Sequence, residues 1–151
     1  MNIGRLCQKN AITVLPSNSL NEVAELIRQQ RVGYFVVVQP ANDEGVCKPI
    51  GVITSRDIVV SVVGRTVNTQ KLRVEDVMTL DPMIGLATDS IEMVLPKMRK
   101  ACVRRIPVTG SRGELVGVLS FDNLFDTIAD EMRKIVGAIH GERPIERVMR
   151  S

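Results

Sequence analysis

The 151-residue chain contains the same succession of segments twice. In each half, hydrophobic periodicity predicts a strand, a helix, two strands and a second helix. Each half is too small to bury a good core alone, so the two halves should pack sheet to sheet or through shared helices. The equivalent positions are Asn18 with Asp89, Leu20 with Ile91, Phe35 with Ile106, and Gly51-x-x-Thr54 with Gly117-x-x-Ser120, provided that the first hairpin has the longer loop.

Proline, glycine and N-cap residues divide the first half into its expected elements. These are a short strand at residues 10–15 closed by Pro16, a helix after the N-cap candidates 17–19, a buried strand at 34–38, a turn at 40–45, a strand at about 50–53 and a helix ending near Gly64. The apolar faces expected on the helices are Leu20, Val23, Ala24 and Ile27 on the first and Ile58, Val59, Val62 and Val63 on the second.

The second half repeats this pattern, with strands expected at 82–86, 105–108 and 115–119 and a turn at 111–113. Asp89 and Glu92 form a capping box for a helix through Arg99, which Pro96 should kink or shorten. A last helix, entered at residues 120–123, extends toward Ala138. We therefore divide the chain into repeat 1 (1–64), a polar connector (65–73), repeat 2 (74–140) and a tail (141–151).

Composition narrows the classes of partner. The hydrophobic residues are mostly aliphatic, with three Phe, one Tyr and no Trp, so nucleic-acid bases would find few aromatic side chains to stack on. A net charge of +3, spread along the chain, gives little electrostatic reason for polyanion binding. Nucleic acid is not expected as a partner.

The cysteines indicate a reducing compartment. Cys7, Cys47 and Cys102 are odd in number and far apart, and His140 is the only histidine, so neither a disulfide framework nor a metal site is supported. Neither a secretory segment nor an apolar run long enough to span a bilayer is found. We expect a cytoplasmic protein without a membrane partner.

Residues 51–57, Gly-Val-Ile-Thr-Ser-Arg-Asp, predict a strand that passes directly into a helix. Free backbone N–H groups and the positive end of the helix dipole can bind phosphate at such a junction. Thr54 would add a hydroxyl donor and Asp57 a carboxylate acceptor. The same spacing also suits a helix cap without any ligand, and both interpretations stay open.

The repeated motifs resemble those of a CBS-domain pair, also called a Bateman module, over roughly residues 3–135. The motifs that carry the resemblance are Gly-Val-Ile-Thr-Ser-Arg-Asp-Ile (51–58), Val-Gly-Val-Leu-Ser-Phe-Asp-Asn-Leu (116–124), Val-Glu-Asp-Val-Met-Thr (74–79) and Val-Arg-Arg-Ile-Pro-Val (103–108). The resemblance implies an α+β fold of two tandem βαββα repeats, packed through their sheets with pseudo-twofold symmetry. It also implies two clefts for adenosine-containing ligands such as AMP, ADP, ATP, S-adenosylmethionine or NAD, and frequent homodimers.

Family positions transfer to this chain residue by residue. Thr54 becomes a phosphate contact and Asp57 the acceptor for the ribose hydroxyls, since a carboxylate only accepts and a diol offers two donors. In the second cleft Ser120 keeps its role, but Asn123 replaces the carboxylate and Asp122 lies one position away, so we expect that cleft to be weaker or empty. The implied adenine contacts are Thr13, Val14, Leu15, Tyr34 and Phe35 for one cleft and Ile84, Gly85, Arg105 and Ile106 for the other.

Three arginines have two interpretations each. Arg56 follows the first junction and could complement phosphate or lie in solvent. Arg104 and Arg105 are adjacent, so on a strand they would face opposite ways, one toward a cleft and one toward solvent; a plain surface pair is the alternative.

Three functions follow from these features. The first is a regulatory module that binds an adenosine-containing nucleotide and signals to an unidentified protein in trans, with no obligatory cofactor. The second is a ligand-free scaffold for dimerisation or interaction. The third, an enzyme, is disfavoured because the chain shows no nucleophile–base arrangement and no Walker-type loop.

Overall fold

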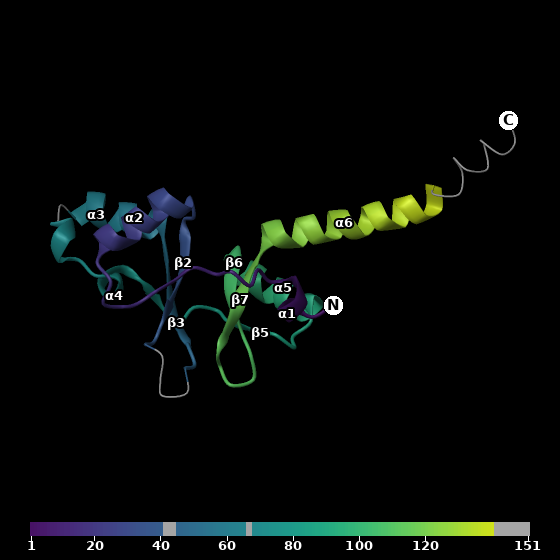
Figure 1. Cartoon of the computed structure of the whole chain (residues 1–151), viewed down its shortest axis with the longest axis horizontal. Helices are drawn as coiled ribbons and strands as arrows, with labels where there is room; N and C mark the ends of the chain where they lie inside the picture. The colour runs from purple at the N-terminus through teal and green to yellow at the C-terminus, as the bar shows by residue number, and fades with distance from the viewer. Residues whose placement is uncertain (41–44, 66–67, 141–151) are drawn as a thin grey trace, which may run out of the picture.

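The computed structural model describes residues 1–40, 45–65 and 68–140, which form two β-sheets side by side with helices on their outer faces (Figure 1). In chain order the elements are α1 (Ile3–Leu6), β1 (Thr13–Val14), α2 (Leu20–Gln30), β2 (Tyr34–Val38), β3 (Pro49–Thr54), α3 (Ser55–Arg65), the 3₁₀ helix η1 (Thr69–Lys71), α4 (Val74–Val77), β4 (Thr79–Leu80), β5 (Gly85–Leu86), α5 (Ile91–Lys100), β6 (Arg105–Thr109), β7 (Leu115–Ser120) and α6 (Phe121–His140).

The two sheets have the same topology. The first has the order β1-β2-β3-β4, and β1 runs parallel to β2 while β2 and β3 are antiparallel. The second has the order β5-β6-β7 with the same directions, and Tyr34 pairs with Thr54 as Arg105 pairs with Ser120. The predicted α+β fold of two βαββα repeats is therefore confirmed, including its pseudo-twofold symmetry.

The sheets pack against each other, as expected for halves too small to fold alone. Val36 and Val38 of β2 meet Val118 of β7, and Tyr34, Ala11 and Leu115 pack around this contact. Branched aliphatic side chains suit the flat inner faces of packed sheets. Strands β2 and β7 therefore provide the contact between the two sheets.

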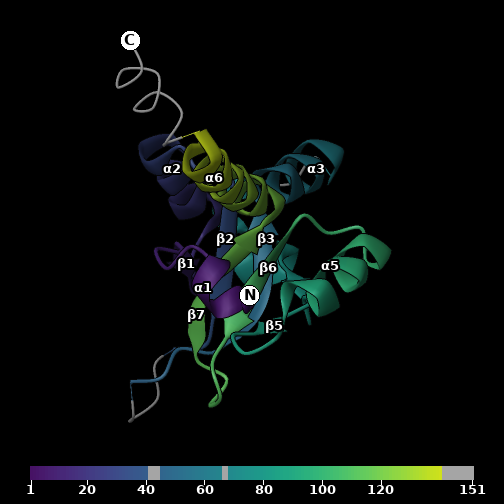
Figure 2. The ribbon, with the colours of Figure 1, turned by 90° about the vertical axis from the view of Figure 1, so that its right-hand side faces the viewer.

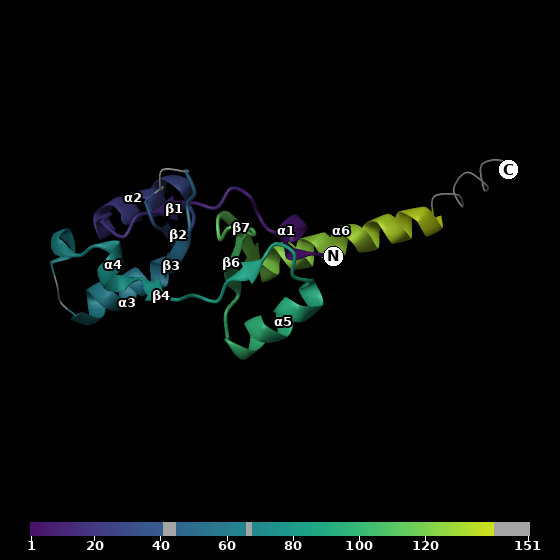
Figure 3. The same ribbon diagram turned by 90° about the horizontal axis from the view of Figure 1, so that it is seen from below.

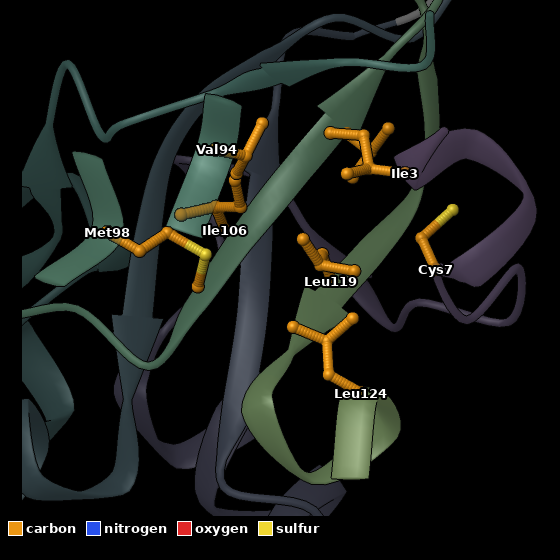
Figure 4. Packing of buried hydrophobic residues seen from close by; sticks show 8 residues of the cluster. Ile3, Cys7, Val94, Met98, Ile106, Leu119 and Leu124 are labelled. Atoms are coloured by element: carbon orange, nitrogen blue, oxygen red, sulfur yellow. The ribbon is translucent and has the colours of Figure 1, made fainter. Parts of the chain in front are cut away.

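Each sheet also has its own core on its outer face. The buried residues of the first are Val14, Leu20, Val23, Phe35, Val37, Ile53 and Val74, and those of the second are Ile3, Cys7, Val94, Met98, Ile106, Val108, Leu119 and Leu124 (Figure 4). Figure 2, which looks roughly along α6, shows α1 and α5 in front of the second sheet.

The two repeats exchange their leading segments. Ile3 and Cys7 lie in the second core, and Gln8 forms a bridge with Val118 of β7. In return Val74 is fully buried in the first core, and β4 pairs with β3. Each sheet therefore includes a segment that lies, in sequence, just before the other repeat.

Several local predictions need correction. Ala24, Val59 and Val63 are exposed. From α2, Leu26 and Ile27 pack against the first core, and from α3 Ile58 and Val62 do so. Helix α5 is capped by Ser90 rather than by the Asp89–Glu92 pair: Ser90 accepts from Met93 N–H, and Asp89 accepts from Leu86 N–H.

Other predictions differ in extent. The first strand of each repeat is confined to two residues, and α5 continues past Pro96 to Lys100. Part of the turn expected at 40–45, part of the connector and the whole tail 141–151 lie outside the described residues. Among the described helices, none is both long and apolar enough to cross a membrane.

Candidate functional site

A cavity of about 670 Å³ opens between the repeats, where both strand-to-helix junctions meet. Both repeats and the segment joining them contribute to it. Its lining consists of Gly33, Tyr34, Val52, Thr54, Ser55, Arg56, Asp57, Thr79, Asp81, Pro82, Met83, Ala101, Cys102, Val103, Arg104, Arg105, Ile106, Ser120, Phe121 and Asp122.

The β3–α3 junction is closed by a reciprocal cap. Thr54 N–H donates to Asp57 Oδ2 at 2.9 Å, and Asp57 N–H donates to Thr54 Oγ1 at 3.1 Å. Both side chains are half-buried. Among the described residues, the hydroxyl hydrogen of Thr54 has no acceptor and Asp57 Oδ1 has no donor. The cap thus leaves one donor and one charged acceptor at the cavity.

The β7–α6 junction is built differently. Asn123 N–H donates to Ser120 Oγ at 3.2 Å, but the Ser120 hydroxyl donates to Asn123 Oδ1 at 2.6 Å. The hydroxyl hydrogen is therefore used within the junction itself. Ser120 lines the cavity and is buried, whereas Asn123 is outside the lining and Asp122 is within it.

The first N–H groups of the two helices have matching partners. Ser55 N–H donates to the Gly33 carbonyl at 3.0 Å, and Phe121 N–H donates to the Arg104 carbonyl at 3.1 Å. The next N–H groups, those of Arg56 and Asp122, have no partner in the described chain. Both belong to the first turn of a helix, where the dipole favours an anion.

Tyr34 and Arg105 meet beside the cavity. The Arg105 guanidinium lies over the Tyr34 ring, 5.7 Å from its centroid, which is within the range of a cation–π contact. Burial raises the pKa of the Tyr34 hydroxyl, and the positive charge of Arg105 lowers it by a smaller amount. The tyrosine therefore stays neutral at physiological pH.

The charges around the cavity are mixed. Arg56, Arg104 and Arg105 are opposed by Asp57, Asp81 and Asp122. The expectation that Arg104 and Arg105 face opposite ways assumed that both lie in a strand, but β6 begins only at Arg105 and Arg104 precedes it. Both arginines line the cavity. Cationic and anionic groups are thus available for a ligand that carries both phosphate and hydroxyl groups.

The cavity brings together eight of the predicted site residues: Tyr34, Thr54, Arg56, Asp57, Arg104, Arg105, Ile106 and Ser120. Among the described residues, seven other predicted ones lie outside its lining: Thr13, Val14, Leu15, Phe35, Ile84, Gly85 and Asn123. Val14 and Phe35 are buried in the first core, whereas Thr13 and Ile84 are exposed elsewhere. A ligand role for these fifteen residues remains a prediction.

Apart from Arg104, the residues that loops contribute to the cavity were not predicted from the sequence. Gly33, just before β2, occupies the position equivalent to Arg104, just before β6, so the repeat alignment could have pointed to it. Nothing in residues 79–83 distinguishes them from an ordinary connection.

In the part of the chain that the structure describes, no group of three or more His, Cys, Asp or Glu side chains could hold a metal ion.

A family model described as CBS domain matches residues 3–64 and 74–130. Among curated proteins, the uncharacterised protein MK0525 of Methanopyrus kandleri is 27% identical over 142 residues, which cover 89% of this chain and 69% of that protein. The chain spans only about a quarter of the length of several other relatives, including a homoserine O-acetyltransferase of Methanococcus vannielii (24%).

Two solved structures show the same arrangement. The CBS domain protein PAE2072 of Pyrobaculum aerophilum, in complex with AMP, is 27% identical with a TM-score of 0.70, and the match covers 82% of this chain and 90% of that one. The CBS domain pair of protein MJ0100, in complex with 5′-methylthioadenosine and S-adenosyl-L-methionine, is 21% identical with a TM-score of 0.69 and coverages of 85% and 99%. The second likeness concerns the fold alone.

Proposed function

Because the chain belongs to the CBS domain family, we propose that it is a regulatory module that binds an adenosine-containing ligand in the cavity between its repeats. The observation that carries this proposal is the meeting of both Gly-x-x-Thr/Ser junctions at one cavity. Support comes from PAE2072, which was solved with AMP.

Asp57 holds the ribose in this proposal. One of its oxygens is used by the cap, and the other can accept from the ribose hydroxyls as a charged acceptor. The Thr54 hydroxyl and the free N–H groups of Arg56 and Asp122 face a phosphate, with the cavity arginines as counter-charges.

The Asp57 site is the stronger of two in our proposal. At the second junction the Ser120 hydroxyl is already engaged by Asn123, and no carboxylate stands at position 123. Thr13, Val14, Phe35 and Ile84 are proposed adenine contacts only if a ligand reaches beyond the cavity lining. The division of the chain into two repeats, a connector and a tail, with boundaries after residues 64, 73 and 140, is likewise part of this proposal.

The output of the module is a protein–protein signal. Ligand occupancy would change how the two junction helices sit, and another protein would sense this change. We expect no turnover of the ligand and no obligatory cofactor. A cytoplasmic location suits Cys47 and Cys102, which are exposed free thiols.

Calorimetric titration of AMP against matched variants tests the site. Asp57→Asn should weaken AMP binding about tenfold, because a charge-assisted hydrogen bond becomes a neutral one. Asp76→Asn is the control: Asp76 caps Arg73 N–H at 2.8 Å in the same way, but it is exposed and away from the cavity. The control should bind AMP like the wild type.

A ligand-free scaffold is the second candidate, and the reciprocal Thr54–Asp57 cap favours it because the cap fully explains both residues as structural. Under this alternative no member of a panel of AMP, ATP, NAD and S-adenosylmethionine shifts the melting temperature. Equal AMP affinity of the wild type and Asp57→Asn would also reject our assignment of the ribose site.

A further inference from the structure

A second pocket, of about 470 Å³, adjoins the cavity between the repeats. We name it the α5 pocket, because it lies where the last turns of α5 approach the start of α6. Figure 3 shows α5 beside the second sheet, with the chain after it leading back to β6. Four residues line both spaces: Cys102, Val103, Arg104 and Phe121. A ligand in the cavity therefore has the α5 pocket next to it.

The α5 pocket is lined mainly by apolar side chains. Leu95, Met98 and Arg99 of α5 complete its lining. Met98 is fully buried in the second core, and Leu95, Val103 and Phe121 pack against that core. Ligand pockets are typically lined in this way, with a few polar groups at defined points. An apolar group that enters the α5 pocket is removed from water without losing hydrogen bonds of its own.

Backbone hydrogen bonds hold the walls of the α5 pocket in place. Val103 N–H donates to the Met98 carbonyl at 3.1 Å, which ties the chain after α5 to the last turn of that helix. Phe121 N–H donates to the Arg104 carbonyl at 3.1 Å, which ties the start of α6 to the same segment. A ligand that fills the pocket does not have to order these segments, so little of its binding free energy is lost.

The border between the cavity and the α5 pocket is positively charged. Arg104 lines both spaces, and neither Arg104 nor Arg99 forms an ion pair with another described residue. The free N–H of Asp122 directly follows Phe121, so a phosphate at the start of α6 would lie at this border. Arg104 would be its counter-charge, and any group attached to the phosphate would be next to the α5 pocket.

We propose that the α5 pocket binds an apolar arm attached to the phosphate of the adenosine ligand. The ligand class is then an adenosine phosphate ester, with its ribose at Asp57, its phosphate at Arg104 and its arm between Leu95 and Phe121. AMP itself carries no such arm. This inference rests on the proposed function, because it needs the ribose and the phosphate to bind in the cavity.

A second anionic group on the ligand is the alternative occupant, because Arg99 lines the α5 pocket. The apolar arm is favoured for two reasons. An anion would lose hydration beside the hydrophobic side chains of the pocket. Arg99 is exposed, so its charge can stay in water while the aliphatic part of its side chain covers apolar surface.

Matched esters of AMP test the arm by calorimetric titration. The n-butyl ester and the 4-hydroxybutyl ester have the same charge and nearly the same length. Each buried methylene should strengthen binding about fourfold, so the butyl ester should bind at least about tenfold more tightly than the hydroxybutyl ester. Equal affinities of the two esters overturn this inference, and so does tighter binding of the 3-carboxypropyl ester.

AMP in the same titration separates this inference from the proposed function. Binding of AMP together with equal affinities of the butyl and hydroxybutyl esters removes the arm and keeps the nucleotide site. Failure of AMP and of every ester to bind removes both.

A substitution within α5 tests the location. Leu95→Gln places an amide in the α5 pocket, so the preference for the butyl over the hydroxybutyl ester should fall at least about threefold. Met93→Gln is the matched control: Met93 is 54% exposed on the same helix and lies outside the lining, so the preference should be kept. An unchanged preference in Leu95→Gln would place the arm elsewhere and overturn the inference.

Alkylation of Cys102 gives a second measurement that leaves the pocket unchanged. In a Cys47→Ser background Cys102 is the exposed thiol, because Cys7 is buried. A saturating concentration of the butyl ester should slow the reaction of Cys102 with N-ethylmaleimide several-fold more than saturating AMP does. Equal protection by the two compounds would contradict an arm in the α5 pocket.

Discussion

Tyr34 is the only tyrosine in a chain without tryptophan, so its ionisation can be followed by ultraviolet absorbance without overlap. Burial raises its pKa above the ordinary value of 10.0. Between that value and the folded pKa the unfolded state binds fewer protons than the folded state, so the free energy of unfolding should fall as the pH rises. The stabilising contribution of Tyr34 is fully present below pH 10 and is lost progressively as the pH rises from 10 toward the pKa of the folded state. Chemical denaturation across this pH range, with tyrosinate absorbance, measures it.

A substitution of Arg105 tests the smaller, opposing effect on the Tyr34 pKa. Its charge lowers the Tyr34 pKa, so Arg105→Gln should move tyrosinate formation to still higher pH. Arg112→Gln, in an exposed turn, should leave the titration unchanged. Tyrosinate that forms in the folded protein near pH 10 would contradict the burial of the hydroxyl.

Residue spacing predicted the first junction well and the second poorly. Thr54 and Asp57 were identifiable because one short motif contains both the hydroxyl and the carboxylate, and the motif fixes their mutual distance. Asp81 was not, since it reaches the cavity only through the way the repeats pack. The adenine contacts Val14 and Phe35 followed from the resemblance, but their side chains fill the first core.

Two glycines at equivalent positions allow the exchanged segments to approach the strands. A Cβ on Gly51 would lie 2.8 Å from the carbonyl oxygen of Thr79, and one on Gly117 would overlap the backbone oxygen of Gln8 and lie 2.9 Å from Cys7 Sγ. The glycine of each Gly-x-x-Thr/Ser motif is therefore explained by backbone packing. It needs no ligand.

Gly117→Ala should destabilise the protein by about 1–3 kcal/mol, because the added methyl group meets backbone that cannot turn aside. Gly64→Ala is the matched control. A Cβ there meets nothing within 4 Å in helix α3, so this change should stabilise by about 0.5–1 kcal/mol. Urea unfolding of both variants gives the comparison, and a neutral Gly117→Ala would show that the segment of Gln8 can move away.

Long periodic segments were predictable, and short ones were not. Residues 20–30, 34–38 and 115–120 carry enough apolar periodicity to be assigned from sequence. Helices α1 and α4 have four residues each and strand β4 has two, too few for a periodic signal. Their conformation depends on packing against the other repeat, and the sequence of the segment alone does not contain that information.

The exchange of leading segments joins the two repeats more firmly than a sheet-to-sheet contact alone would. Residues 1–8 complete the second core, and residues 74–80 complete the first. If the chain were cut between the repeats, each piece would lose a segment that packs in its own core. It would also keep a segment that belongs to the core of the other repeat. Both cores are therefore built from segments on either side of the sequence boundary between the repeats.

Two single substitutions, each of a fully buried isoleucine, test this exchange of segments. Ile3→Ala should cost about 2–5 kcal/mol and should speed native-state hydrogen exchange in β6 and β7, although Ile3 belongs to the first repeat in sequence. Ile53→Ala, of the same chemistry and burial, should instead loosen β2 and β3. Faster exchange in β2 and β3 for Ile3→Ala would mean that the N-terminal segment packs on its own repeat. Equal loosening of both sheets by either change would mean that the cores unfold only together.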